Sequence, residues 1–184
     1  MQYYDNQLIV FTGAPGAGKT STLEELARLG WSVSPEAARA IIRHSMHVGG
    51  PALPWGDLTA FRDAMLLQTE KDYWEARKLP GPVFFDRGWP DSETVPFSEE
   101  ILTQMAPLRY YPEVFVFRPW EEIYSQDAER KQSFAEACQS CEHMCQSYLR
   151  LGYTLVDVPP GSIPERARWI LRHLRLVYTP DLGL

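Results

Sequence analysis

The stretch Leu8–Thr20, LIVFTGAPGAGKT, decides the fold of this chain. Its first four residues are all apolar, as expected for a β-strand that is buried on both faces of a parallel sheet. Gly13–Thr20 matches the pattern Gly-x-x-x-x-Gly-Lys-Ser/Thr at every defined position. Leu23 and Leu26 follow with the spacing of an amphipathic helix. A strand, a glycine-rich loop and a helix in this order predict a phosphate-binding loop (P-loop).

Backbone N–H groups are expected to bind the ligand in this loop. Glycines let the backbone curl so that several N–H groups point at phosphate oxygens, and the following helix adds the partial positive charge of its N-terminus. Lys19 is expected to reach the β- and γ-phosphates, and Thr20 to offer a hydroxyl to Mg²⁺. The loop therefore predicts a site for a nucleoside triphosphate with Mg²⁺. The predicted nucleotide contacts are Gly13, Ala14, Pro15, Gly16, Ala17, Gly18, Lys19, Thr20 and Ser21.

The remainder of the chain alternates strand-like and helix-like segments, which is typical of a parallel sheet covered by helices. Further strands are predicted at residues 31–33, 82–86, 113–117 and 153–156. Helices are predicted from residue 19 to near Gly30, from 57 to 79 and from 162 onward. Another helix is predicted to begin at Pro35 with Ser34 as its N-cap, and a loop is predicted at 44–55. Two further helical stretches are expected between 117 and 153. No linker divides the 184 residues, so we expect one three-layer α/β/α domain spanning residues 1–184.

The charge and the hydropathy pattern limit the partners of the protein. The formal net charge is −6, which argues against broad binding to nucleic acid or to an anionic membrane. No apolar run approaches the length of a membrane span, and the N-terminus lacks the basic and then apolar pattern of a signal peptide. We therefore expect a cytoplasmic protein without a nucleic-acid partner.

Asp86 ends the apolar segment 82–86 and is followed by Arg87 and Gly88. At this place in a P-loop protein an acidic residue holds Mg²⁺, usually through water. Arg87 would face a transferred or acceptor phosphate, and Gly88 would allow a close approach of the backbone. The alternative is an ordinary strand-end acid that pairs with Arg87. Because a P-loop precedes it, we favour the functional interpretation of Asp86 and Arg87.

Glu36, Arg39 and Arg43 have the spacing of one helix face directly after the second strand. In an open parallel sheet this helix begins at the edge where ligands bind. Glu36 is a candidate general base for an acceptor hydroxyl, with Arg39 or Arg43 holding an anionic group. The alternative is that Glu36 complements the helix dipole and pairs with Arg39 on a solvated face.

Two further groups are candidates for the site. Arg130 and Lys131 follow the fourth strand, at the place where P-loop kinases carry a lid. Arg130 is the better candidate to neutralise the charge of the transferred phosphoryl group, because its guanidinium group is planar. The alternative is a mixture of charges on a helix surface. Trp55 and Trp89 lie in loops near the expected cleft and either line an acceptor pocket or pack within their loops.

With these residues in place, the chain resembles the AAA-type P-loop family of bacterial ATPases and kinases related to the ribosylnicotinamide kinase domain. The resemblance covers most of the chain. It implies a nucleoside-kinase-like core, a sheet ordered 2-3-1-4-5, kinase-like roles for Asp86 and Arg87, and an acidic position near the acceptor at Glu36. Gly88 stands where nucleoside kinases usually have Ser. Besides the P-loop, the segments that carry the resemblance are 35–39, 53–55, 85–88, 119–120, 127–130, 152–153 and 158–159.

Two functions are consistent with this pattern. The first is a Mg²⁺-dependent kinase that passes the γ-phosphoryl group of ATP to a small hydroxyl-bearing acceptor such as a nucleoside-like metabolite. In it Lys19 and Arg130 stabilise the phosphoryl group, Thr20 and Asp86 hold Mg²⁺, and Glu36 or Asp86 accepts the proton. The second is an ATPase- or GTPase-type regulatory module without an acceptor. ATP is the default nucleotide, because the chain contains no guanine-reading Asn-Lys-x-Asp motif. A DNA-associated ATPase is disfavoured by the acidic net charge.

Overall fold

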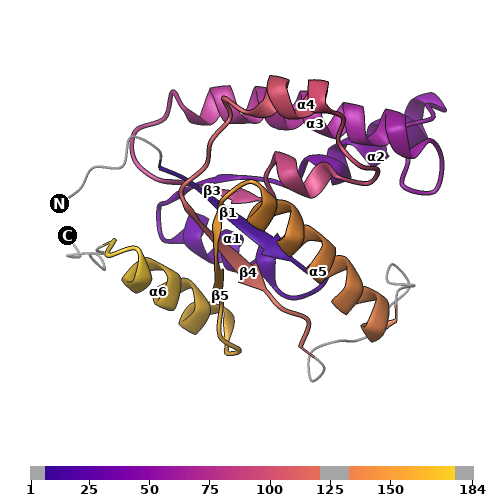
Figure 1. Cartoon of the computed structure of the whole chain (residues 1–184). Coiled ribbons are helices and arrows are strands. Elements are labelled where there is room, and N and C mark those ends of the chain that lie inside the picture. Colours follow the sequence, from indigo (N-terminus) through magenta and orange to yellow (C-terminus); the bar gives the residue numbers. More distant parts are fainter. Residues whose placement is uncertain (1–6, 121–132, 177–184) are drawn as a thin grey trace.

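One parallel sheet of five strands organises the protein, whose computed structural model describes residues 7–120 and 133–176. The strand order is β2-β3-β1-β4-β5 (Figure 1). This confirms the α/β class and the order that the resemblance implies. The strands are β1 (Leu8–Gly13), β2 (Ser32–Ser34), β3 (Val83–Asp86), β4 (Glu113–Phe117) and β5 (Thr154–Asp157). Because the strands are parallel, their carboxyl ends meet at one edge of the sheet.

Helices cover both faces of this sheet, and β1 supplies alternate side chains to the two cores. Ile9 and Phe11 belong to the core under α1 and α6, whereas Leu8 and Val10 belong to the core under α3 and α4. Residues of α5 take part in both cores. The helices are α1 (Lys19–Arg28), α2 (Ala37–Val48), α3 (Leu58–Ala76), α4 (Glu99–Met105), α5 (Phe134–Arg150) and α6 (Ile163–His173), with a short 3-10 helix η1 (Trp89–Ser92).

The structure corrects the predicted bounds around α2. Ser34 is the last residue of β2 and pairs in register with Phe85, so it is not the N-cap of a helix. The backbone is still extended at Glu36, which is the N-cap, and α2 begins at Ala37. The helix then continues beyond His44 as far as Gly49, whose left-handed backbone ends it. The predicted loop from residue 44 is therefore wrong in its first five residues.

The remaining differences concern short or peripheral elements. Neither η1 nor α4 was predicted between β3 and β4. Of the two helical stretches predicted between β4 and β5, one is α5, and the segment 121–132 lies outside the described residues. Within the described ranges, no helix combines the length and the apolar character needed to cross a membrane.

Candidate nucleotide and acceptor site

The P-loop connects β1 to α1 at the carboxyl edge of the sheet, as predicted. Gly13 has a φ angle of 121°, and a Cβ atom added to it would lie 2.2 Å from the carbonyl oxygen of Phe117 at the end of β4. The same carbonyl accepts a hydrogen bond from the Ala14 N–H at 3.1 Å. Only glycine fits this close approach, which fixes the start of the loop against β4.

Lys19 lies buried inside the loop. Its Nζ donates hydrogen bonds to the carbonyl oxygens of Gly13 at 3.1 Å and Ala14 at 2.7 Å. Burial, and next the nearby guanidinium of Arg87, lower the pKa of Lys19 to about 7. A bound polyphosphate would favour the charged ammonium. The loop thus holds the buried amino group of Lys19 beside the backbone that is predicted to bind the phosphates.

Thr20 and Asp86 form a pair with the chemistry of a Mg²⁺ site. Thr20 Oγ1 donates a hydrogen bond to Asp86 Oδ2 at 2.7 Å, and Asp86 Oδ1 is buried without a hydrogen-bond partner among the described residues. Burial is the main cause of the raised pKa of Asp86. A hydroxyl and an unsatisfied carboxylate oxygen are the hard oxygen donors that Mg²⁺ accepts, often through water. These two residues therefore fit the predicted metal.

Arg87 is held between two carboxylates. Its Nε donates to Glu36 Oε1 at 3.0 Å and its Nη1 donates to Asp91 Oδ1 at 3.1 Å. Burial opposes its positive charge, but Asp91 and Glu36 raise the pKa of Arg87 above its ordinary value. Arg87 also has a φ angle of 75°, in the left-handed region that non-glycine residues rarely adopt. Such strain persists where surrounding contacts fix the residue, and it clusters at functional sites.

Glu36 forms the ion pair with Arg39 that its structural interpretation predicts, and it also forms an ion pair with Arg87. It lies near Asp86 and Arg87, and its second oxygen, Oε2, accepts a hydrogen bond from the exposed Arg39 at 3.1 Å. Burial by itself would raise the pKa of Glu36, but Arg87 and Lys19 outweigh it and lower the pKa. Both carboxylate oxygens of Glu36 are thus occupied by arginines.

Asp91 is one of the residues of the site that sequence reasoning missed. Its carboxylate is 3% exposed and accepts hydrogen bonds from four groups. They are the hydroxyls of Thr12 and Tyr148, the backbone N–H of Gly88 and Arg87 Nη1. These donors come from β1, the β3–η1 turn and α5, so Asp91 ties three parts of the fold to Arg87. One local signal existed, because an acid three residues into a short helix caps the N–H of Gly88.

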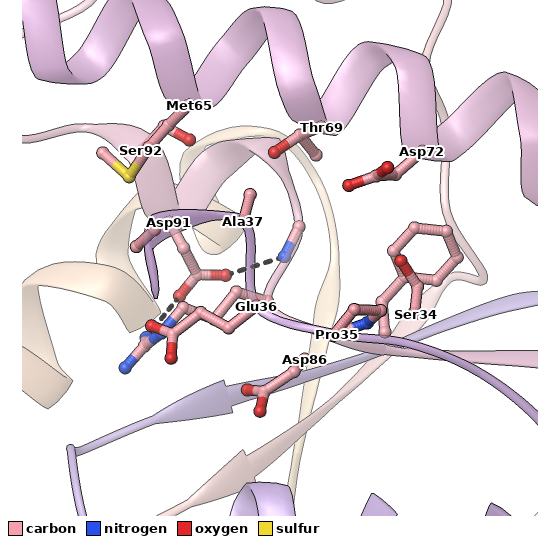
Figure 2. A pocket seen from close by; sticks show the side chains of 14 residues that line it. Ser34, Pro35, Glu36, Ala37, Met65, Thr69, Asp72, Asp86, Asp91 and Ser92 are labelled. Carbon is pink, nitrogen blue, oxygen red and sulfur yellow. Dashed lines mark hydrogen bonds and ion pairs between the residues drawn. The ribbon is translucent and has the colours of Figure 1, made fainter. Parts of the chain in front are cut away.

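A pocket that is open to solvent lies beside Asp86 and Arg87, and the empty space of about 350 Å³ in and above it includes part of that solvent. The β2–α2 connection, α3 and the β3–η1 turn line it. Figure 2 shows Thr69 and Asp72 extending from α3 toward the space above Glu36 and Asp86. Asp72 Oδ1 accepts a hydrogen bond from Gln68 at 2.8 Å, and burial raises the pKa of Asp72. We call this space the acceptor pocket, after the second substrate that we propose for it below.

The other predicted residues lie away from the pocket or outside the described structure. Arg130 and Lys131 fall in the segment that is not described. Arg43 is exposed on α2 and does not line the pocket. Trp89 is 1% exposed and its indole N–H donates to the Leu108 carbonyl at 3.0 Å, so it packs in the core and does not stack on a ligand. Trp55 is 68% exposed in the loop before α3.

Solved structures with a similar fold include several P-loop kinases. The deoxyadenosine kinase from M. mycoides with dCMP and dCDP aligns with a TM-score of 0.59 and 14% identity, over 92% of this chain and 100% of that one. The NadR protein in complex with NAD and AMP-PNP aligns with a TM-score of 0.62 and 16% identity, over 97% of this chain and 52% of that one. Shikimate kinase from Acinetobacter baumannii with shikimate has a TM-score of 0.54 and 16% identity, over 92% of this chain and 93% of that one. At these identities the likeness shows the fold that this chain shares with P-loop kinases.

Sequence comparison gives the family. No curated protein matches the chain significantly in sequence. A family model described as an AAA domain matches residues 8–166, which include the P-loop, the Thr20–Asp86 pair and the whole acceptor pocket. The chain belongs to this AAA-domain family of P-loop proteins.

Proposed function

We propose that this protein is a Mg²⁺-dependent kinase that transfers the γ-phosphoryl group of ATP to a hydroxyl of a small acceptor. The observation that carries the proposal is the acceptor pocket, which shares Asp86 and Arg87 with the P-loop side of the site. A P-loop alone suits hydrolysis, switching and transfer equally. A pocket next to the metal-site carboxylate is what transfer to a second substrate requires.

In the proposed reaction the acceptor hydroxyl oxygen forms a bond to the γ-phosphorus while the bond to the β,γ-bridging oxygen breaks, and ADP leaves. Lys19 and Arg87 stabilise the negative charge of the transferred group, and Arg130 is proposed to add to them. Thr20 and Asp86 would hold Mg²⁺, which neutralises charge on the phosphates when bound.

The proton of the acceptor hydroxyl goes to Asp86 or to Glu36. The contacts favour Asp86, because its Oδ1 has no hydrogen-bond partner among the described residues. Glu36 is the weaker candidate because both of its oxygens bind arginines and its pKa is lowered. We therefore assign Glu36 the task of holding Arg87 in place.

Charge narrows the class of acceptor. The acceptor pocket is lined by four carboxylates, of Glu36, Asp72, Asp86 and Asp91, and by one guanidinium, of Arg87, which already pairs with two of them. A phosphate on the acceptor would meet repulsion and find no free cation among the lining residues. We propose a neutral or cationic acceptor without phosphate, such as a nucleoside-like metabolite, whose N–H or O–H groups donate to Asp72.

The test is to incubate the protein with Mg·ATP or Mg·GTP and a panel of nucleosides, nucleotides and vitamins, and to look for a phosphorylated product by mass spectrometry. We expect transfer to one or more unphosphorylated compounds and none to the nucleotides. Tight nucleotide binding without a product from any acceptor would contradict the kinase and favour a regulatory module.

A further inference from the structure

A buried arginine from the far end of the chain contacts the P-loop. Arg166 lies on α6 and is only 4% exposed. Its Nη1 donates a hydrogen bond to the Ala17 carbonyl at 2.8 Å, and its guanidinium carbon lies 4.5 Å from the centroid of the Phe117 ring. These contacts place the guanidinium between the end of β4 and the last turn of the phosphate loop.

The positive charge of Arg166 has no carboxylate partner in the described part of the chain. Within residues 7–120 and 133–176 no ion pair involves Arg166, and its Nε is buried without a hydrogen-bond acceptor there. Burial lowers the pKa of Arg166, and no neighbouring acid counters this effect. A buried cation without a counter-charge is unfavourable, and proteins normally pair such a group. Arg166 therefore lacks the negatively charged partner that a buried cation normally has.

Gly18 lets this guanidinium come close to the loop. A Cβ atom at Gly18 would lie 2.7 Å from Arg166 Nη1, so any other residue would push the guanidinium away. Gly18 immediately precedes Lys19, the first residue of α1, where the helix N-terminus presents its N–H groups. Arg166 therefore brings an unpaired positive charge to the backbone that is predicted to hold the phosphates.

We propose that Arg166 is a nucleotide-binding residue that acts through the loop, and that the bound polyphosphate is its missing counter-charge. Its contribution to affinity then increases with the number of negative charges on the ligand. The inference rests on the phosphate-binding part of the proposed function and is independent of transfer to an acceptor.

The test compares the dissociation constants of ATP, ADP, AMP and adenosine for the parent protein and for Arg166→Gln. Glutamine keeps a neutral donor for the Ala17 carbonyl and removes the charge. We expect ATP binding to weaken by about tenfold or more, ADP binding to weaken less, and adenosine binding to stay the same. Arg172→Gln, on the exposed side of the same helix, is the matched control for net charge and should leave all four constants unchanged.

Stability of the free protein separates this role from a structural one. Arg166→Gln should melt close to the parent temperature without ligand, because glutamine keeps a donor for the Ala17 carbonyl and removes an unpaired buried charge. The variant should gain less stability from ATP than the parent does. A lower melting temperature with an equal loss of affinity for all four ligands, or unchanged affinities, would overturn the proposal. If Arg166→Gln does not fold, Arg166→Lys replaces it. That variant keeps the charge without the guanidinium contacts and should retain the dependence on phosphate number, and loss of that dependence would equally overturn the proposal.

Discussion

Thr20 Oγ1 and Asp86 Oδ2 lie 2.7 Å apart although 66 residues separate them in the chain. The pairing of β1 with β3 brings them together, because Phe11 aligns with Asp86 and both strands end at the same edge. Thr20 is the second residue of α1 and Asp86 is the last residue of β3, so both side chains are attached to regular elements of the fold. The contact joins the nucleotide side of the site to the acceptor pocket.

Asp86→Asn should lower the rate of phosphoryl transfer by about a hundredfold or more, because it removes the proposed proton acceptor and one metal-site oxygen. Nucleotide binding should persist, since the P-loop backbone is untouched. The rate is measured with a coupled ADP assay and binding by calorimetry. Glu36→Gln is the contrasting variant, and we expect about a tenfold loss through the displacement of Arg87. The roles given to Asp86 and Glu36 are wrong if the losses are reversed.

Asp91→Asn should destabilise the protein by about 3 kcal/mol and lower its activity. The amide cannot accept from all four donors that the carboxylate now satisfies, and Arg87 loses one of its two acidic partners. Urea unfolding measures the change in the free energy of unfolding. The control is Asp63→Asn, whose carboxylate is 56% exposed and pairs only on the surface. Equal effects of the two substitutions would contradict the central position of Asp91.

Gly88→Ala should destabilise the protein by about 1–3 kcal/mol through steric overlap. The added Cβ would lie 2.8 Å from Tyr110 Cε2 and 2.8 Å from the Tyr148 hydroxyl oxygen. A serine at this position would meet the same overlap. Gly50→Ala is the control, because its Cβ would meet the nearest atom at 3.5 Å. Thermal melting of both variants gives the comparison, and a parent-like Gly88→Ala would show that the tyrosines move aside.

Asp72→Asn should flatten the dependence of stability on pH in the acidic range. Burial raises the pKa of Asp72 in the folded protein, so the folded state holds the proton more tightly than the unfolded state. Stability is therefore lost as the pH rises from the unfolded pKa of about 3.9 through the folded pKa. The variant removes this loss and should be at least as stable as the parent at neutral pH, as measured by urea unfolding across pH. A marked loss of stability there would mean that the Gln68 hydrogen bond outweighs burial.

Local patterns sufficed to predict the strands of the sheet and the position of the P-loop. The P-loop is one continuous segment, and the strands 82–86 and 113–117 are apolar runs that end close to where the structure ends them. Asp86 and Arg87 could be assigned because they directly follow such a run. The acceptor side was less predictable, since it is built from three separate segments whose distance depends on packing.

Asp91 and Arg166 were not predicted from the sequence, and the physical reason is the same for both. The carboxylate of Asp91 binds Thr12 and Tyr148, which are 79 and 57 residues away, and Arg166 contacts a carbonyl 149 residues away. No periodicity or spacing encodes such contacts. The start of α2 was misplaced for a related reason, because the pairing of Ser34 with β3 overrides the local signal for an N-cap.

Ion pairs hold one side of the acceptor pocket in place, and residues of a single helix form the other side. Glu36, Arg87 and Asp91 are locked to one another at the carboxyl edge of the sheet. The opposite wall is a single stripe of α3 with Met65, Thr69 and Asp72 at helical spacing. The chemical groups on this side of the pocket therefore come from three positions of one helix.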